Sequence, residues 1–235
     1  MNRKGKVIGK SNSRPVVKKP PWMELPEGIW ANILHRLGAV EILETAEKVC
    51  SKWRRVCKDP SMWRVIDMWN LGDLSEMDYD LEVMCRYAVD RSQGEVVDIN
   101  LQYFATAQLL EYIAERKTEK TYHCMLLWYG DYFDNEDVRN EEALAIAKNL
   151  PTLHHLQLIG NMMTIKGVEA ILDNCPHLVS LDLRLCKYVS LNKVLSNRIS
   201  GQIKNMKHPH DSLAGLEFSF VACGEGDEDQ MSDDY

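Results

Sequence analysis

The chain has 235 residues, of which 45% are apolar and 27% are charged, and its formal net charge is −7. That length allows one ordinary domain or two small ones with a hydrophobic core, and the composition is that of a globular protein. No apolar run approaches the roughly 20 residues that cross a bilayer, and the basic start has no apolar core behind it. We therefore expect neither a membrane protein nor a secreted one.

The two ends of the chain carry opposite charge. Residues 1–21 contain seven Lys or Arg and no acid, which predicts a disordered basic tail, with a nuclear import signal or a polyanion contact as alternatives. Residues 201–235 are expected to form a C-terminal tail that is acidic at its end. The seven cysteines are irregularly spaced, which is typical of reduced, mostly buried thiols. The sequence thus predicts a protein of the nucleus or cytoplasm, with no nucleic-acid or membrane partner.

Residues 22–69 have the apolar spacing of short helices. One helical face carries Ile29, Ile33, Leu34 and Leu37. A second face carries Ile42, Ala46, Val49, Cys50 and Trp53. Gly38 lies between the two runs, where a helix commonly ends. Residues 70–95 are predicted to form a helical connector, with a helix over 81–89.

From residue 96 to residue 200 the pattern becomes a repeat of about 25 residues, the signature of leucine-rich repeats. The clearest copies are Leu153-x-x-Leu156-x-Leu158-x-x-Asn161 and Leu178-x-x-Leu181-x-Leu183-x-x-Cys186. An earlier copy begins at Val96, and residues 117–140 fit poorly. We expect the leucines to be buried and the Asn or Cys to satisfy backbone groups in the following turn. The predicted fold class is α + α/β, a helical N-terminal unit followed by a short leucine-rich-repeat solenoid with parallel strands and outer helices.

The segment from Trp22 to Ile66 carries an ordered set of motifs. They are Leu25-Pro26-Glu27, Ile33-Leu34, Val49-Cys50-Ser51-Lys52-Trp53-Arg54, Asp59-Pro60 and Trp63-Arg64. In this order they resemble the F-box family. Together with the repeats, the chain resembles the plant Skp-interacting F-box/LRR proteins over nearly all of residues 22–200.

This resemblance implies a non-catalytic substrate-recognition subunit of an SCF-type E3 ubiquitin ligase. Its F-box would bind a Skp-family adaptor, and through it a cullin and a RING protein. The resemblance implies these adaptor-binding residues: Leu25, Pro26, Ile33, Leu34, Leu37, Ile42, Leu43, Val49, Cys50, Trp53 and Trp63. A unit of about 45 residues is also too small to bury all of its apolar side chains. The alternative is a helical domain that closes on its own core.

The repeats are expected to bind an unknown protein substrate. On each predicted strand, the residues between the leucines point to the concave face. The expected target-binding residues are Asp98, Asn100, Gln102, His155, Gln157, Ile159, Ser180, Asp182 and Arg184. For each of them, a merely solvated position on the sheet is the alternative.

No motif for catalysis, a cofactor or a metal is evident. Gly9-Lys10-Ser11 lacks the earlier glycine of a phosphate loop, and Cys175-x-His177 and His208-x-His210 do not match zinc spacings. Cys50 and Cys57 are predicted to be core residues rather than nucleophiles. We therefore expect no enzyme, no cofactor and no metal. Two other functions stay open: a non-ligase protein-interaction scaffold built on a truncated repeat array, and a ligase with a catalytic cysteine.

Overall fold

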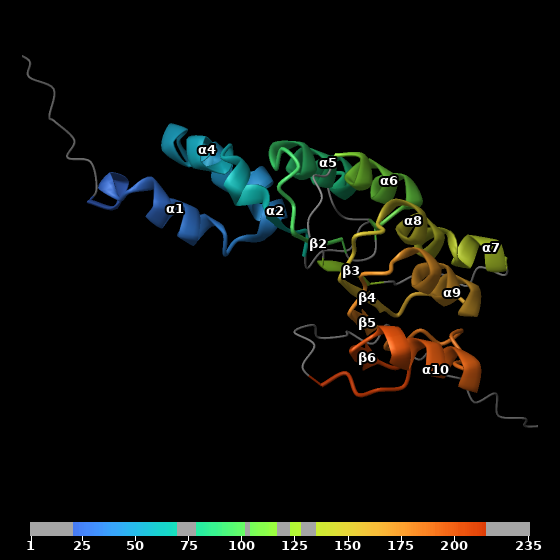
Figure 1. The fold of residues 1–235 in the computed structure, drawn as a ribbon. Coiled ribbons are helices and arrows are strands. Elements are labelled where there is room, and N and C mark those ends of the chain that lie inside the picture. The colour runs from blue at the N-terminus through green and yellow to red at the C-terminus, as the bar shows by residue number, and fades with distance from the viewer. Residues whose placement is uncertain (1–20, 70–78, 102–103, 117–122, 128–134, 215–235) are drawn as a thin grey trace, which may run out of the picture.

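The structure is a computed structural model that describes residues 21–69, 79–101, 104–116, 123–127 and 135–214. Short helices lie at one end of the molecule, and a sheet with a row of helices beside it extends to the other end (Figure 1). We call residues 21–63 the helical region and residues 65–214 the sheet region. None of the helices in these ranges is long and apolar enough to span a bilayer.

The helical region consists of short segments. They are η1 (Pro21–Glu24), α1 (Glu27–Leu34), α2 (Gly38–Glu41), the π-helical η2 (Ile42–Ala46), α3 (Glu47–Val49), α4 (Ser51–Cys57) and η3 (Pro60–Trp63). Gly38 has a φ of 75°, a conformation that suits glycine and lets the chain turn between α1 and α2. The predicted second helix is interrupted at Cys50, which is extended and whose Sγ accepts a hydrogen bond from Trp53 N at 3.5 Å.

The sheet has six parallel strands in chain order. They are β1 (Val65–Asp67), β2 (Asp98–Asn100), β3 (His123–Leu127), β4 (His155–Ile159), β5 (Ser180–Asp182) and β6 (Asn205–Lys207). From β4 onward, residues that pair in neighbouring strands are separated by the same number of positions along the chain. His155 pairs with Ser180, and Ser180 pairs with Asn205. Parallel strands need such crossover connections, which helices supply here.

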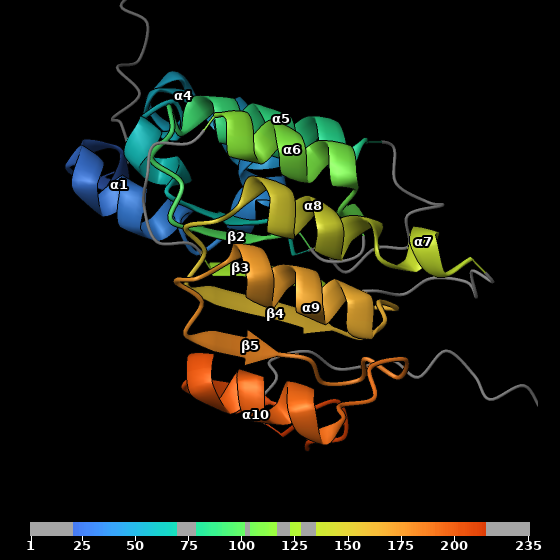
Figure 2. The same cartoon turned by 45° about the vertical axis from the view of Figure 1, so that its right-hand side comes forward.

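The helices of the sheet region lie along one side of the sheet. They are α5 (Leu81–Arg91), α6 (Ala107–Glu115), α7 (Glu136–Arg139), α8 (Glu141–Asn149), α9 (Ile165–Asn174) and α10 (Lys193–Gln202). Figure 2 shows α5, α6, α8 and α9 stacked in a row beside the strands. Several begin at a side chain that accepts a backbone hydrogen bond, as Thr106 does from Leu109 N and Asn192 from Leu195 N. Such N-caps satisfy amides that a helix end leaves unpaired.

The turns after β4 and β5 use the side chains that the repeat pattern predicts. Asn161 Oδ1 accepts a hydrogen bond from Met163 N at 2.9 Å. At the equivalent position of the next repeat, Cys186 Sγ donates to Leu158 O at 2.8 Å. In both turns a buried side chain satisfies a backbone group that would otherwise lose its hydrogen bond to water.

The sheet extends beyond the predicted repeat range of residues 96–200 at both ends. β1 lies within the segment predicted to be a purely helical unit, and it pairs with β2 through Ile66 and Ile99. β6 lies in residues 201–235, which were expected to be a tail. Each of these strands has only three residues, too few for a clear apolar alternation along the chain. The domain boundaries themselves stay a prediction.

The helical and sheet regions share one hydrophobic core. It runs without interruption from Trp30 and Leu34 through Ile66 to Ile203. An ion pair between Arg91 of α5 and Glu47 of α3, with an N–O distance of 2.8 Å, also joins the regions. Because apolar side chains from both regions lose contact with water together, we expect the two regions to depend on each other for stability.

Candidate protein-interaction surfaces

One side of α1 and the turn after it expose a row of aliphatic side chains. Ile29, Ile33 and Leu37, one helical turn apart from each other, are 45%, 41% and 40% exposed. On the opposite side of the same helix, Trp30 and Leu34 are buried in the core. A short helix that is apolar on both sides can bury only one of them within its own fold. An exposed aliphatic row of this kind is typical of a protein-binding surface.

Polar contacts hold α1 in place against α4. Lys52 Nζ donates a hydrogen bond to Leu25 O at 2.7 Å, which fixes the chain just before the helix. Glu27 at the start of α1 forms an ion pair with Arg55 of α4. The exposed row is thus presented by a positioned helix, so a partner would lose little conformational entropy in ordering it.

Three Trp residues pack behind this surface. Trp22 contacts Trp30 edge-to-face with ring centroids 5.9 Å apart, and Trp30 contacts Trp53 at 5.3 Å. Trp63 has a different position: it is 1% exposed, and its Nε1 donates to Cys57 O at 2.7 Å. Trp63 is therefore a core residue, whereas the half-buried Trp53 and the exposed Trp22 pack against Trp30 at the edge of the core.

The residues predicted to bind the adaptor fall into three groups by burial. Exposed are Pro26, Ile33, Leu37 and Val49. Half-buried are Leu25, Cys50 and Trp53. Buried are Leu34, Ile42, Leu43 and Trp63. The last group is covered by this chain itself, because β1 and α5 add apolar surface to a core that we expected the short helices to build alone. Ile29, which precedes Ile33 by one helical turn, belongs to the exposed row and was absent from the predicted set.

The outward face of the sheet is polar along β2 and β4. Asp98, Asn100, His155 and Gln157 are half-buried there, and Ser180 has a similar exposure on β5. Gln102 lies outside the described residues. This outward face also includes β1, which the predicted repeat range left out. Val65 and Trp69 are exposed there on either side of half-buried Asp67. Asn100 Nδ2 donates to Asp67 Oδ1 at 2.9 Å and joins the first two strands.

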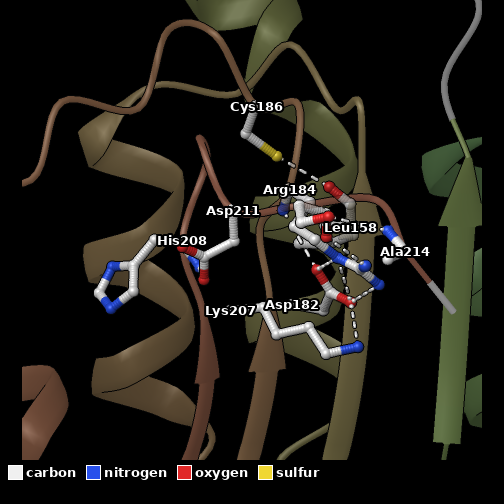
Figure 3. A network of polar contacts seen from close by, with 9 residues as sticks. Leu158, Asp182, Arg184, Cys186, Lys207, His208, Asp211 and Ala214 are labelled. Atoms are coloured by element: carbon white, nitrogen blue, oxygen red, sulfur yellow. Dashed lines mark hydrogen bonds and ion pairs between the residues drawn. The ribbon is translucent and has the colours of Figure 1, made fainter. Parts of the chain in front are cut away.

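Three of the predicted target-binding residues are buried, which corrects the expectation of exposure: Ile159, Asp182 and Arg184. The prediction assumed that regular strand alternation continues to residue 184. In the structure β5 ends at Asp182, and Leu185 has a positive φ of 63°. The segment 208–214 then turns back and covers Arg184, whose Nη1 donates to Ser212 O at 3.0 Å (Figure 3).

Asp182 and Arg184 form a buried ion pair. Arg184 Nε and Nη2 donate to the Asp182 carboxylate at 2.9 and 2.6 Å, and Lys207 Nζ approaches it at 3.3 Å (Figure 3). Burial alone raises the pKa of the Asp182 carboxyl. The hydrogen bonds from Arg184 and the charges of Arg184 and Lys207 outweigh burial, so the pKa lies below its usual value. This pair holds the sheet and the segment 208–214 together and is not free to bind a target.

The described residues offer little for catalysis. Burial raises the pKa of the Cys57 and Cys175 thiols to about 11 and that of Cys186 to about 12, so these thiols are protonated and poor nucleophiles near neutral pH. Within the described ranges no three His, Cys, Asp or Glu side chains lie close enough to hold a metal ion. The surfaces described above are suited to contacts with other proteins.

The order of elements and the aliphatic row on α1 define a protein-binding module of helices fused to a parallel sheet. A family model described as F-box-like matches residues 22–69. Among curated proteins of Arabidopsis thaliana, the F-box protein SKIP19 is 44% identical over 240 residues, which cover 83% of this chain and 80% of the relative. The chain belongs to the F-box protein family.

Other relatives connect the chain to F-box/LRR-repeat proteins. The putative F-box/LRR-repeat protein 23 of the same plant is 40% identical over 241 residues, which cover 81% of this chain and 54% of the relative. The putative F-box/LRR-repeat protein 21 is 34% identical over 262 residues, which cover 85% of each chain. The similarity in each case extends well beyond residues 22–69 into the sheet region.

Proposed function

We propose that this chain is the substrate-recognition subunit of an SCF-type ubiquitin ligase. Its F-box binds a Skp-family adaptor, which connects it to a cullin and a RING protein. Its sheet is a short leucine-rich-repeat array that binds the protein to be ubiquitinated. The chain itself contributes no catalytic group. We place this activity in the nucleus or cytoplasm, where such ligases and reduced thiols are both expected.

The observation that carries the proposal is the exposed row Ile29, Ile33 and Leu37 on a fixed helix. Fully burying a large aliphatic side chain gains about 1.5–3 kcal/mol. Because these three are 40–45% exposed, covering them would gain roughly 2–4 kcal/mol before the costs of association. Val49, also exposed, and half-buried Leu25 offer further apolar area. Among the described residues none covers this row, because the core lies on the other side of α1, so a second protein would supply the gain.

Target binding is proposed for the F-box-proximal part of the sheet. The segment 208–214 covers the end of β5, whereas side chains of β1, β2 and β4 remain accessible, among them Val65, Asp67 and His155. The constant spacing of β4, β5 and β6 and the helices that connect them support the leucine-rich-repeat interpretation.

The adaptor surface is tested by measuring the affinity of the purified chain for a purified Skp-family adaptor. Replacing Ile29 and Ile33 by Glu is expected to weaken binding at least about tenfold, which corresponds to about 1.4 kcal/mol. The matched control is Val194→Glu, an even more exposed aliphatic position on α10 far along the chain, which should leave the affinity unchanged. If the α1 variant bound as tightly as the wild type with an unchanged melting temperature, the proposed surface would be wrong.

A reconstituted ligase distinguishes a substrate receptor from a non-ligase scaffold. The complex with adaptor, cullin and RING protein is expected to ubiquitinate proteins that bind the sheet, and Val65→Glu on β1 should reduce this modification while adaptor affinity stays the same. A complex that assembles fully but modifies none of the proteins bound to the sheet would favour the non-ligase scaffold.

A further inference from the structure

The last strand of the described sheet has an open outer edge. β6 (Asn205–Lys207) pairs with β5 on one side, and no other described strand pairs with its other side. Open strand edges carry unpaired backbone groups and are commonly covered by another segment or protected by charged side chains. At this end of the sheet, lysines lie at positions 204 and 207, just before the strand and at its last residue.

The surroundings of this edge are strongly basic. Residues 187–214 contain five Lys or Arg but a single acid, Asp211. Arg198 and Lys207 pair with acids of other segments, Asp173 and Asp182. The carboxylate of Asp211 accepts a hydrogen bond from His208 N at 2.7 Å. Lys193 and Lys204 are exposed and form no ion pair with any carboxylate in the part of the chain that the structure describes. We refer to Lys193, Lys204, Lys207, His208 and His210, which lie at the start of α10 and around β6, together as the basic end.

The chain leaves the described structure at this same end. After β6, Leu185 N donates to Pro209 O at 2.9 Å, and Arg184 Nη1 donates to Ser212 O at 3.0 Å. These contacts fix the segment 208–214 across the end of β5. Residue 214, from which the following residues continue, is therefore held close to the end of the sheet that carries Lys207.

The residues that follow have the complementary charge. Residues 215–235 contain seven Asp or Glu and no Lys or Arg, and six of the acids fall within residues 225–234. At about 3.3 Å per extended residue, the stretch from Ala214 to Glu225 can reach roughly 36 Å. Neighbouring strands are only about 4.8 Å apart. Every lysine of the basic end is therefore within reach.

We propose that residues 225–234 dock onto the basic end and cover the outer edge of β6. Isolated ion pairs between exposed side chains are weak. A short tether raises the effective concentration of the attached segment to the millimolar range, so several weak pairs together can hold it. Because these pairs are exposed to solvent, salt screens them and releases the segment. This interaction is independent of adaptor binding, because β6 is at the opposite end of the sheet from β1 and the helical region.

Zero-length cross-linking of the full chain by a carbodiimide tests the contact directly. This reagent joins lysines to carboxylates that touch, and mass spectrometry of the monomer identifies the joined peptides. We expect residues 225–234 to cross-link to Lys193, Lys204 and Lys207 at least about fivefold more than to Lys148 and Lys166, with the difference lost in about 0.5 M salt. Lys148 and Lys166, whose side chains are 73% and 64% exposed on α8 and α9, are controls matched to Lys207, because each of the three pairs with a carboxylate, Glu111, Glu136 and Asp182 respectively.

Hydrogen exchange of a charge-neutral variant gives the second measurement. Replacing Asp227, Asp229, Asp233 and Asp234 by Asn and Glu228 by Gln should speed exchange at the amides of residues 204–208 by about threefold or more, while β4 is unchanged. Equal cross-linking to the control lysines, or unchanged exchange in this variant, would overturn the proposal. Cross-links found only between two molecules would overturn it as well and would assign the edge to a second copy of the chain.

Discussion

The helical region exposes large apolar side chains, whereas the sheet region buries charged ones. The helical region leaves Ile29, Ile33 and Leu37 in contact with water although each could fill a core. The sheet region buries even a charged pair, Asp182 and Arg184, under its own segment 208–214. The first region has more apolar surface than its fold can cover, whereas the second satisfies costly buried groups internally.

The helical region therefore depends on a partner to cover its apolar surface, whereas the sheet region depends on contacts within the chain. Exposed aliphatic rows gain free energy only when another protein covers them. A buried ion pair is stable only while both charges are present, because either one alone lacks the water that would solvate it. Substitutions on the exposed side of α1 should therefore affect binding, whereas substitutions in the buried pair should affect folding.

The largest effect is expected at the junction between the two regions. Trp63→Ala removes a fully buried indole, its hydrogen bond to Cys57 O and its contact with Arg91, whose guanidinium lies 5.4 Å from the ring centroid. The expected loss is about 3–5 kcal/mol of unfolding free energy. Urea unfolding followed by circular dichroism should show both regions shifting together, since they share one core. A sheet that unfolds at the wild-type urea concentration would show that the regions are independent.

Breaking the buried pair should cost somewhat less. Arg184→Ala leaves the Asp182 carboxylate buried with Lys207 and the backbone amide of residue 184 as its remaining partners among the described residues, so we expect about 3 kcal/mol of destabilisation, at the low end for such pairs. Replacing both residues together, Asp182→Leu with Arg184→Met, should cost less than Arg184→Ala alone. The three chains are compared by thermal or urea unfolding. A double variant that is less stable than the single one would contradict the assignment.

The same pair, Asp182 and Arg184, predicts that the stability of the chain depends on pH in the acid range. Because the pKa of Asp182 is lowered in the folded state, its stabilisation is present above the unfolded-state value of about 4 and is lost as pH falls through the folded-state pKa. The chain with Asp182→Leu and Arg184→Met should therefore lose less stability than the wild type below about pH 4. Parallel curves for the two chains in this range would refute the role of Asp182.

Glu142 should give a smaller effect of opposite sign. Burial raises the pKa of its carboxyl from 4.5 to about 7, so the folded chain keeps a proton that the unfolded chain loses. The contribution of this group to stability is thus highest below about pH 4.5 and falls as pH rises to about 7. Glu142→Gln should be more stable than the wild type by about 1–2 kcal/mol at about pH 8 and by less at about pH 5. Glu141→Gln removes only the smaller contribution of the neighbouring charge to this pKa and should give a smaller gain. An equal gain in both variants would contradict the leading role of burial.

The smallest effect on stability is expected on the exposed row. Ile33→Ser should change the unfolding free energy by less than about 1 kcal/mol, because the side chain is 41% exposed and lies outside the buried core. Leu34→Ala, one residue away but buried, should cost about 2–5 kcal/mol. If both substitutions destabilised the chain equally, Ile33 would belong to the core, and the contrast between the two regions would fail.

Much of this arrangement could be predicted from local patterns. The turn at Gly38, the roles of Asn161 and Cys186, and the burial of the repeat leucines all follow from spacing along the chain. In the helical region, the surplus of apolar residues indicated that some of them would remain exposed. Spacing identifies which residues share a face, because helices and strands have fixed periods.

The spacing of apolar residues along the chain could not predict which distant segment covers each face. Asp182 and Arg184 were assigned to an exposed face, and their burial depends on the segment 208–214, which returns from further along the chain. In the same way, Ile42, Leu43 and Trp63 were assigned to a partner surface, because β1 and α5 could not be foreseen as part of their core.

Local sequence patterns were sufficient for the F-box motifs, the helix faces and the repeat period, because these depend on neighbours within a few turns or on one repeat. The three-dimensional arrangement was needed to establish which apolar side chains stay exposed on α1 and which charges are buried beside β5. Burial is a property of the segments that meet in space, and those contacts join residues that no local period relates.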